Sequence, residues 1–273
     1  MRLRWVLVFA LIASGVLVTT VLRDRSPVRS EYCTMKVGKL NGQIDLEQAQ
    51  WSALIAAIGI RRGLPPRAAT IAIATAFQES KLHNIDYGDR DSVGLFQQRP
   101  SQGWGTVAQI LDPHYSIGKF YDALVKIKGY GSMEITVAAQ KVQRSAYAGA
   151  YAQHEGYARA LASSLTGYSP AGFTCQLNDH GKGSIASIDK DVQSAFGRID
   201  SYKGKDRLSF PMHGTKANKS ARGWALAHYL VANAANLKIS GVTFDGRAWS
   251  VDDSPKGWTK DSGADSATVR VTN

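Results

Sequence analysis

Hydrophobic residues recur with a helical period through the first part of the chain. A first apolar stripe follows Asp45, which resembles a capping box with Gln48 three residues later, and it ends near Arg61. The Pro65-Pro66 pair opens a second helix that runs to Leu82, since proline suits the first helical turn. After a loop over residues 84–106, further helices are expected over residues 106–111, 113–127, 134–144 and 148–165.

The pattern changes after residue 175. Residues 178–188 are rich in Gly and Ser, which is typical of a linker. Residues 220–237 then show an Ala-rich helical pattern, and short alternating runs at residues 239–244 and 268–271 indicate strands. We therefore expect an all-α domain over residues 44–175, a linker over residues 176–190 and a small α+β domain over residues 191–273.

The N-terminus carries an uncharged run over residues 5–22, with arginines on both sides. Its length of about 18 residues is near the lower limit for a helix that spans a membrane. We expect a signal anchor, a transmembrane helix within residues 1–25, followed by a polar stalk over residues 26–43. The protein would then be a single-pass protein of the cytoplasmic membrane with the bulk of the chain extracytoplasmic. Secretion after signal-peptide cleavage is the alternative.

Composition and charge limit the classes of partner that the protein is expected to bind. The chain is 44% hydrophobic and 20% charged, which is enough for a real core. Its net charge of +11 suits an anionic surface or polymer, and it equally suits simple solubility. Because Lys and Arg are scattered and form no long block, we expect no nucleic-acid partner.

Two cysteines, Cys33 and Cys175, stand at the edges of the expected helical domain. In an oxidising compartment such a pair can form a disulfide that joins the two ends of one domain. Two unrelated free thiols are the alternative, but the positions at the domain edges favour the bridge.

Residues 76–106 combine the residue types that glycan cleavage needs. Glu79 ends an apolar helix, and apolar surroundings raise the pKa of a carboxylic acid, so that it can protonate a glycosidic oxygen near neutral pH. Without a second carboxylate, Glu79 would donate its proton and take one back as a sugar hydroxyl closes on the cation. Hydrolysis normally uses a second carboxylate, for which the candidates are Asp86, Asp89 and Asp91. Alone, these acids also fit plainer roles as solvated charges, turn formers or a calcium site.

The turn after the loop offers contacts for a sugar. Gly94 lets backbone approach a ligand closely, and Gln97 and Gln98 can both donate and accept hydrogen bonds. Tyr87 and Trp104 can stack on sugar faces. The stretch is therefore typical of a cleft wall for a polar polymer.

In this order the motifs resemble a known family. QES followed by GLFQQRPS is similar to the lysozyme-like fold of soluble lytic transglycosylases and goose-type lysozymes. The longer stretch looks like a group of actinobacterial membrane-anchored envelope proteins. The resemblance covers about residues 33–175. It implies Glu79 as catalytic acid/base, Ser80 as its hydrogen-bonding support, and a substrate turn made of Gly94, Leu95, Phe96 and Gln97.

Two departures leave the activity open. The family pattern has a later tyrosine facing the acid, and here both Tyr147 and Tyr151 could take that place. The Gln-Gln-Arg-Pro ending also differs from the usual form. The resemblance implies a peptidoglycan lytic transglycosylase or muramidase acting on glycan strands. A catalytically inactive peptidoglycan-binding or envelope scaffold protein of the same fold is the alternative.

The C-terminal stretch RGWALAHYLVANAANLKISGVTFDGRAWS resembles domains of secreted actinobacterial proteins that are similar to zinc D-alanyl-D-alanine peptidases. Thr268 and Arg270 stand at the positions of the family's His-x-His, and Ser209 stands about where an aspartate is expected. Since neither Thr268 nor Arg270 is a suitable nitrogen ligand, we expect no metal site and no cofactor. His228 is expected as a partly buried histidine and His213 as a turn residue.

Overall fold

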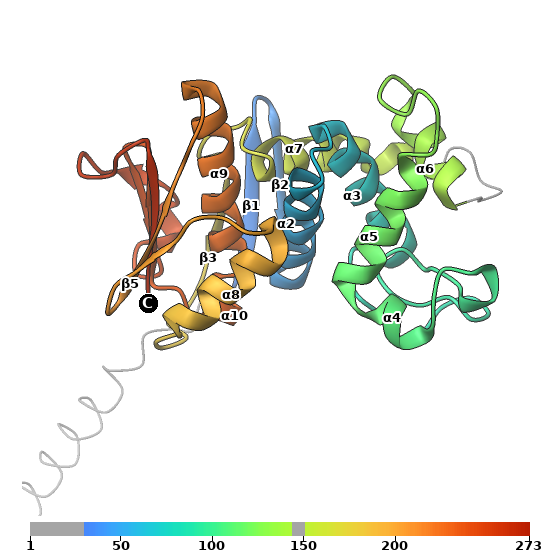
Figure 1. Cartoon of the computed structure of the whole chain (residues 1–273), viewed down its shortest axis with the longest axis horizontal. Coiled ribbons are helices and arrows are strands. Elements are labelled where there is room, and N and C mark those ends of the chain that lie inside the picture. The colour runs from blue at the N-terminus through green and yellow to red at the C-terminus, as the bar shows by residue number, and fades with distance from the viewer. Residues whose placement is uncertain (1–29, 144–150) are drawn as a thin grey trace, which may run out of the picture. The chain divides into compact units, whose positions relative to one another are not determined.

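The computed structural model describes residues 30–143 and 151–273, and Glu31–Asn273 form one unit (Figure 1). The expected anchor over residues 1–25 lies outside the described residues. Within the ranges that are described, no helix is both long and apolar enough to cross a membrane. The expectation of a single-pass membrane protein is therefore not supported by the residues that the structure describes.

The helices α2 to α6 begin within one residue of the positions that the local pattern predicts, whereas the helix expected from residue 148 begins only at Glu155. The Asp45 side chain accepts a hydrogen bond from the Gln48 N–H and the Gln48 side chain accepts one from the Asp45 N–H, which confirms the capping box. The second proline of the Pro65-Pro66 pair is the first residue of α3, as expected. The helices are α2 (Leu46–Arg61), α3 (Pro66–Ser80), α4 (Val107–Leu111), α5 (Pro113–Leu124), α6 (Ile135–Gln143) and α7 (Glu155–Leu165).

The prediction of an all-α domain is wrong, because this part of the chain also contains a three-stranded sheet. Its order is β2-β1-β3, and both pairings are antiparallel. The strands are β1 (Tyr32–Val37), β2 (Leu40–Ile44) and β3 (Phe173–Gln176). In β1, Cys33 and Met35 are buried between more exposed neighbours. Such a short alternation is easily taken for a polar stalk, and its partner β3 comes far later in the chain.

The expected disulfide between Cys33 and Cys175 is confirmed. The two residues lie directly opposite each other in the β1–β3 pairing, so the bond joins neighbouring strands. It closes a loop with a sequence separation of 142 residues. A cross-link over so long a loop restricts the unfolded chain strongly and is expected to stabilise the fold by about 5 kcal/mol.

A six-stranded antiparallel sheet with the order β4-β5-β9-β6-β7-β8 forms the C-terminal part. Its strands are β4 (Tyr202–Lys203), β5 (Arg207–Pro211), β6 (Gly241–Phe244), β7 (Arg247–Ser250), β8 (Thr259–Lys260) and β9 (Thr268–Thr272). Helix α9 (Lys216–Ala232) packs on it, with Trp224 edge-on to Phe244 at a centroid distance of 5.6 Å. The helix approaches closely because Gly223 lies against the Phe244 ring. This confirms a helix in the range expected over residues 220–237. It also confirms the strands expected over residues 239–244 and 268–271, which the structure places at 241–244 and 268–272.

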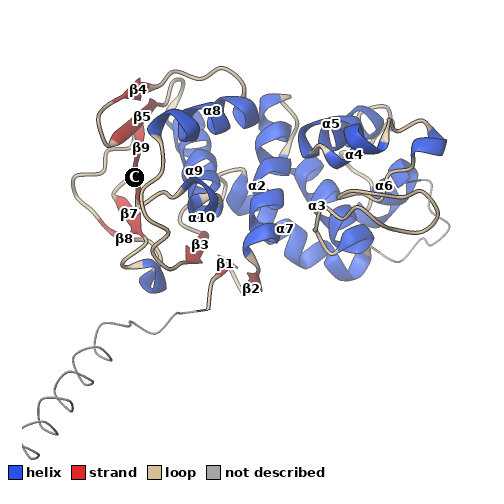
Figure 2. Cartoon of the chain, turned by 90° about the horizontal axis from the view of Figure 1, so that it is seen from below, coloured by secondary structure: helices blue, strands red, loops and turns tan. Residues whose placement is uncertain are grey.

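The helical part and the sheet part share one hydrophobic core. Helix α2 packs against both α9 and α8 (Ile185–Phe196), which begins inside the range expected to be a linker. Short α10 (Ala234–Leu237) follows α9. Figure 2 shows the resulting order, with the helices α2 to α7 on one side of α9 and the larger sheet on the other.

Candidate functional site

Glu79 lies in the last turn of α3, and the chain changes direction directly after it. Lys81 and Leu82 both adopt the left-handed conformation, with φ of 53° and 63°. Their N–H groups bond back to Phe77 and Ala76 carbonyls, which closes the helix end. Glu79 is therefore held at a fixed point from which its side chain can meet later elements.

The carboxylate of Glu79 is largely enclosed. The Tyr151 O–H donates to Glu79 Oε1 at 2.7 Å, and Tyr151 is itself only 1% exposed. The Gln143 side chain also forms a hydrogen bond with Glu79. Burial raises the pKa of Glu79 above its usual range, while the bonds from Tyr151 and Gln143 act in the opposite direction. Of the two tyrosines that the sequence leaves open, the structure brings Tyr151 to the acid, and Tyr147 lies outside the described residues.

Ser80 ties the end of α3 to the turn that follows the loop. Its hydroxyl donates to the Leu95 carbonyl at 2.8 Å and also lies 3.1 Å from the Ala76 carbonyl. The resemblance implied a bond from Ser80 to Glu79. The structure instead commits this hydroxyl to the backbone, so Ser80 positions the turn relative to the helix.

The turn residues Gly94, Leu95 and Phe96 are buried and hold the wall of the site together. Gly94 has φ of 80°, and a Cβ there would come within 3.1 Å of Ile110 in α4. The Leu95 side chain is in the core, and the Phe96 ring stacks on Phe120 at 4.4 Å between centroids. The turn is linked to Glu79 through its backbone. The Phe96 carbonyl accepts a hydrogen bond from the Gln143 side chain, which also forms a hydrogen bond with Glu79.

The two glutamines of the turn have different surroundings. Gln97 has φ of 46°, and its amide donates to the carbonyls of Tyr87 and Gly94. Gln98 is buried and donates to the Ser116 carbonyl at 3.2 Å. In the described part of the chain the Gln98 Oε1 is buried without a hydrogen-bond partner. Gln97 therefore secures the loop, and Gln98 secures α5.

The three loop aspartates are placed unlike Glu79. The Asp91 carboxylate accepts hydrogen bonds from the Ser101 N–H at 2.8 Å and from Arg99 Nε at 2.7 Å, and these bonds hold its pKa far below the usual range. The Asp89 side chain is 93% exposed beside Arg90, and Asp86 is exposed. Asp91 is thus occupied in stabilising the loop, while the other two face solvent.

The two aromatic residues proposed for sugar stacking differ in exposure. Tyr87 is 70% exposed on the loop, so its ring is open to a ligand. Trp104 is half-buried and packs against the core. Only Tyr87 therefore offers a largely open ring face.

Four further residues, none of them among the predicted site residues, hold the last turn of α3 against a later part of the chain. The Gln78 Oε1 accepts from Gln153 Nε2 at 3.1 Å and lies 3.2 Å from His154 Nε2. The Phe77 and His154 rings stack at 5.7 Å, and burial lowers the pKa of His154. All three contacts join the last turn of α3 to the 3₁₀ turn Ala152–His154. The sequence signal for these residues is their position next to Glu79 or shortly after Tyr151.

On the larger sheet, Arg270 is the middle residue of β9, at one of the positions where the resemblance to peptidases places a histidine. It lies opposite Ser209 of β5 on one side and Thr243 of β6 on the other. Its guanidinium forms an ion pair with Asp265, and Thr268 is in the same strand. A permanent positive charge at this point favours an anion rather than a cation.

The two histidines of this part are placed differently. His228 is completely buried, with Nδ1 2.8 Å from the Ser164 carbonyl and the ring packed near Trp224 and Trp258. Burial lowers its pKa to about 4. His213 is exposed beyond β5 and pairs with Asp200 at 3.1 Å.

Comparison with known proteins bears on the second part of the chain. Residues 160–272 match a family model described as VldE, C-terminal domain. This match begins within α7 and ends in β9, so it covers less than half of the chain and does not include Glu79. No curated protein matches the chain. The resemblances to lysozyme-like proteins and to zinc peptidases therefore stay predictions.

Chemically, the arrangement at Glu79 can hold a proton and release it. An enclosed carboxyl group with a raised pKa, one phenol and one amide as neighbours is typical of a general acid. The same group, once ionised, is stabilised by the two hydrogen bonds.

Proposed function

We propose that the protein acts on the glycan strands of peptidoglycan as a lysozyme-like enzyme, with Glu79 as general acid and then general base. The observation that carries this proposal is the enclosure of Glu79 together with its hydrogen bond from Tyr151. Burial favours the protonated acid that donates, and the phenol favours the carboxylate that remains afterwards. Opposed effects on one group suit a residue that must both give and retake a proton.

The reaction would proceed in two steps. The glycosidic C–O bond breaks, its electron pair goes to the leaving oxygen, and that oxygen takes the proton of Glu79. A hydroxyl of the same sugar then adds to the resulting cation and loses its proton to Glu79, which restores the acid and yields an anhydro product without consuming water.

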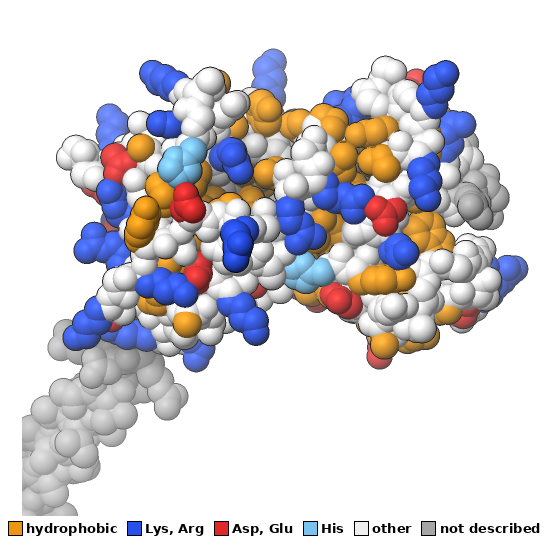
Figure 3. All heavy atoms as spheres, viewed as in Figure 1, with side chains coloured by type: hydrophobic (Ala, Val, Ile, Leu, Met, Phe, Trp, Pro, Cys, Tyr) orange, Lys and Arg blue, Asp and Glu red, His pale blue; other side chains and the backbone are white. Residues whose placement is uncertain are grey.

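The state of the aspartates favours this intramolecular route over hydrolysis. A hydrolytic enzyme normally places a second carboxylate across the scissile bond. Asp91 is committed to Arg99 and Ser101, and Asp89 lies exposed beside Arg90. The basic surface also suits attraction to an anionic wall, since Lys and Arg side chains are spread over the face in Figure 3.

Glycan binding without turnover, or an envelope scaffold role, is the second candidate. It is favoured by the contacts of Ser80, Leu95 and Phe96, which all serve the fold. A chain could therefore keep the motifs of the site for folding alone.

Digestion of purified peptidoglycan separates the two. We expect the protein to release anhydro muropeptides, detected by mass, and Glu79→Gln to abolish their release. The matched control is Glu134→Gln, which changes an exposed glutamate just before α6. If wild type and Glu79→Gln give the same empty digest while both still sediment with the wall, the enzyme proposal fails and the binding role stands.

A further inference from the structure

A cavity lies where the end of α2 meets α8, β5 and α9. Its volume is about 460 Å³, which is the size of a small-molecule site. The apolar lining comes from all of these elements and includes Ile60, Phe196, Met212 and Leu226. Met212 and Leu226 are buried, so they form a floor rather than a rim.

Arg61 supplies a fixed positive charge at the edge of this cavity. Its Nη1 donates to the Ser194 carbonyl at 2.7 Å, at the C-terminal end of α8. The stem of the side chain lies against Gly197, where a Cβ would be 3.2 Å from Arg61 Cγ and Cδ. Gly197 also has φ of 81°, so a larger residue is disfavoured there. Since a guanidinium has several N–H donors, one bond to Ser194 leaves others for a ligand.

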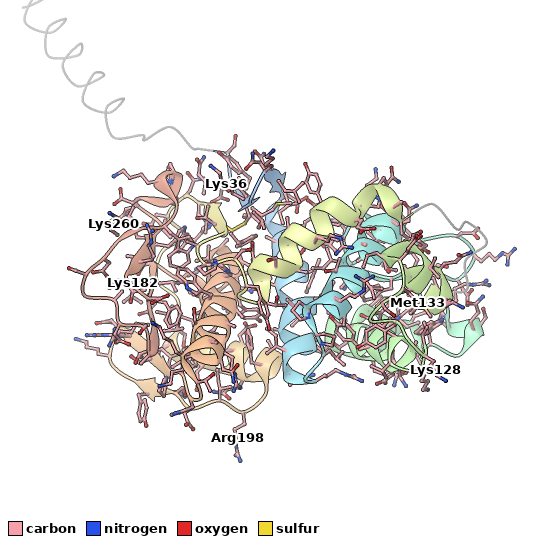
Figure 4. All side chains as sticks on the ribbon, turned by 90° about the horizontal axis from the view of Figure 1, so that it is seen from above. Lys36, Lys128, Met133, Lys182, Arg198 and Lys260 are labelled. Carbon is pink, nitrogen blue, oxygen red and sulfur yellow. A yellow bond between two sulfur atoms is a disulfide. The ribbon has the colours of Figure 1, made fainter. Side chains whose placement is uncertain are left out.

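Arg222 supplies a second positive charge from the exposed side of α9. Together with His213 it also lines a neighbouring cavity of about 330 Å³. Asp200 is the acid in the lining of the larger cavity, and His213 lies 3.1 Å from it. Arg198 lines the cavity as well, but its side chain points away from the body of the molecule in Figure 4, so it adds only a more distant charge.

We infer that this cavity binds a small amphiphilic anion, a molecule with a carboxylate or phosphate group on an apolar chain. The anionic group lies between the guanidinium groups of Arg61 and Arg222, which match such groups in geometry and charge. The apolar chain covers Met212 and Leu226. The site shares no residue with the surroundings of Glu79, so the inference does not depend on glycan cleavage.

Calorimetric titration of the full chain with four probes of equal chain length tests this inference. Hexanoate and hexyl phosphate carry the anionic group, hexanol lacks charge, and hexylammonium reverses it. We expect one-to-one binding of at least one anion with a Kd on the order of 1 mM or tighter, and binding of hexanol and hexylammonium at least about tenfold weaker. The tighter anion shows whether the source is a carboxylate or a phosphate compound. Equal binding of hexanol, or no saturable binding of either anion, would overturn the inference.

Variants at the two arginines provide the second arm. We expect Arg222→Gln to weaken binding of the preferred anion about fivefold and Arg61→Gln about tenfold, because each removes a charge-assisted bond. Lys260→Gln, which removes a charge from β8 at the far edge of the sheet, should change nothing. Arg61→Gln also removes the hydrogen bond to Ser194, so it changes the cavity wall as well as the charge. The variants at the exposed Arg222 are therefore the decisive test. Arg222→Glu should favour hexylammonium over the anions, and unchanged anion binding in both Arg222 variants would contradict the inference.

Discussion

The end of α3 and the loop that follows it each present a carboxylate, and the fold gives the two groups opposite properties. Glu79 is enclosed beside Tyr151 and has a raised pKa, whereas Asp91 lies near the surface between Arg99 and Ser101 and has a strongly lowered one. Both belong to one short stretch of sequence. The comparison shows that desolvation decides the proton affinity of the first and hydrogen bonding decides that of the second.

The buried His228 extends this comparison to the C-terminal part. Burial is the largest influence on both Glu79 and His228, and in both cases it disfavours the charged form. For an acid this raises the pKa, and for a base it lowers it. Each group can therefore be tested by a change of pH.

Exchange of each carboxylate for its amide should separate the two regions most clearly. Glu79→Gln is expected to reduce release of muropeptides at least about a hundredfold, because the general acid is lost. Asp91→Asn should keep most of the rate, since Asp91 holds the loop and faces Arg99. Muropeptide release measured by chromatography gives both rates. Equal losses of rate in the two variants would contradict the different roles assigned to Glu79 and Asp91.

Acid should destabilise the protein through His228. The unfolded side chain titrates near pH 6.5 and the folded one near pH 4, so between these values the unfolded state binds more protons. The contribution is fully present above pH 6.5 and is lost as the pH falls to 4, by about 3 kcal/mol in total. Urea unfolding at several pH values measures this loss.

His228→Gln removes this proton uptake, so its stability should vary less with pH than that of wild type. The control His213→Gln changes an exposed histidine and should retain the wild-type profile. If wild type and His228→Gln show the same pH dependence, burial of this histidine does not have the effect that the structure predicts.

Tyr151→Phe tests the hydrogen bond to Glu79 and should reduce activity less than Glu79→Gln does. Loss of the phenol removes a hydrogen bond that favours the ionised carboxylate, so the pKa of Glu79 should rise further. The fall of activity on the alkaline side should then move to higher pH, and the maximal rate should drop about tenfold. Carbon NMR of the Glu79 carboxyl group follows the pKa even without turnover. Tyr202→Phe, at an exposed tyrosine, is the control, and an unmoved pKa in Tyr151→Phe would count against the assigned contact.

Asp91→Asn should have the smallest effect and should act on stability. The lowered pKa of Asp91 means that its ionised form stabilises the fold above its usual pKa of 3.8, and that this contribution is lost as the pH falls below that value. We expect a slightly lower melting temperature at pH 7 and a difference that shrinks in acid. Asp89→Asn, at a side chain that is 93% exposed, should show no change. A larger effect of Asp89→Asn than of Asp91→Asn would reverse the roles given to the two acids.

Local sequence patterns sufficed for the helices around the site. The capping box at Asp45 and Gln48 and the prolines before α3 act within one helical turn, so they are readable without the fold. The strands over residues 32–37 and 40–44 were missed because they form a short hairpin with a weak alternation, and β1 gains its second partner, β3, only at residue 173. Charge and chain periodicity carry no information about such a distant partner.

By itself the sequence determined that an acid ends an apolar helix, that Gly94 begins a tight turn after a polar loop, and that two cysteines flank one region. Each of these depends on residue type and on neighbours a few positions away. Only the tertiary structure decided what surrounds the acid. Tyr151 reaches Glu79 across 72 positions of the chain. The Ser80 hydroxyl donates to the Leu95 carbonyl of the turn, and Asp91 of the loop pairs with Arg99. The physical reason is that burial and hydrogen bonding of a carboxylate are set by groups that folding brings together from distant segments.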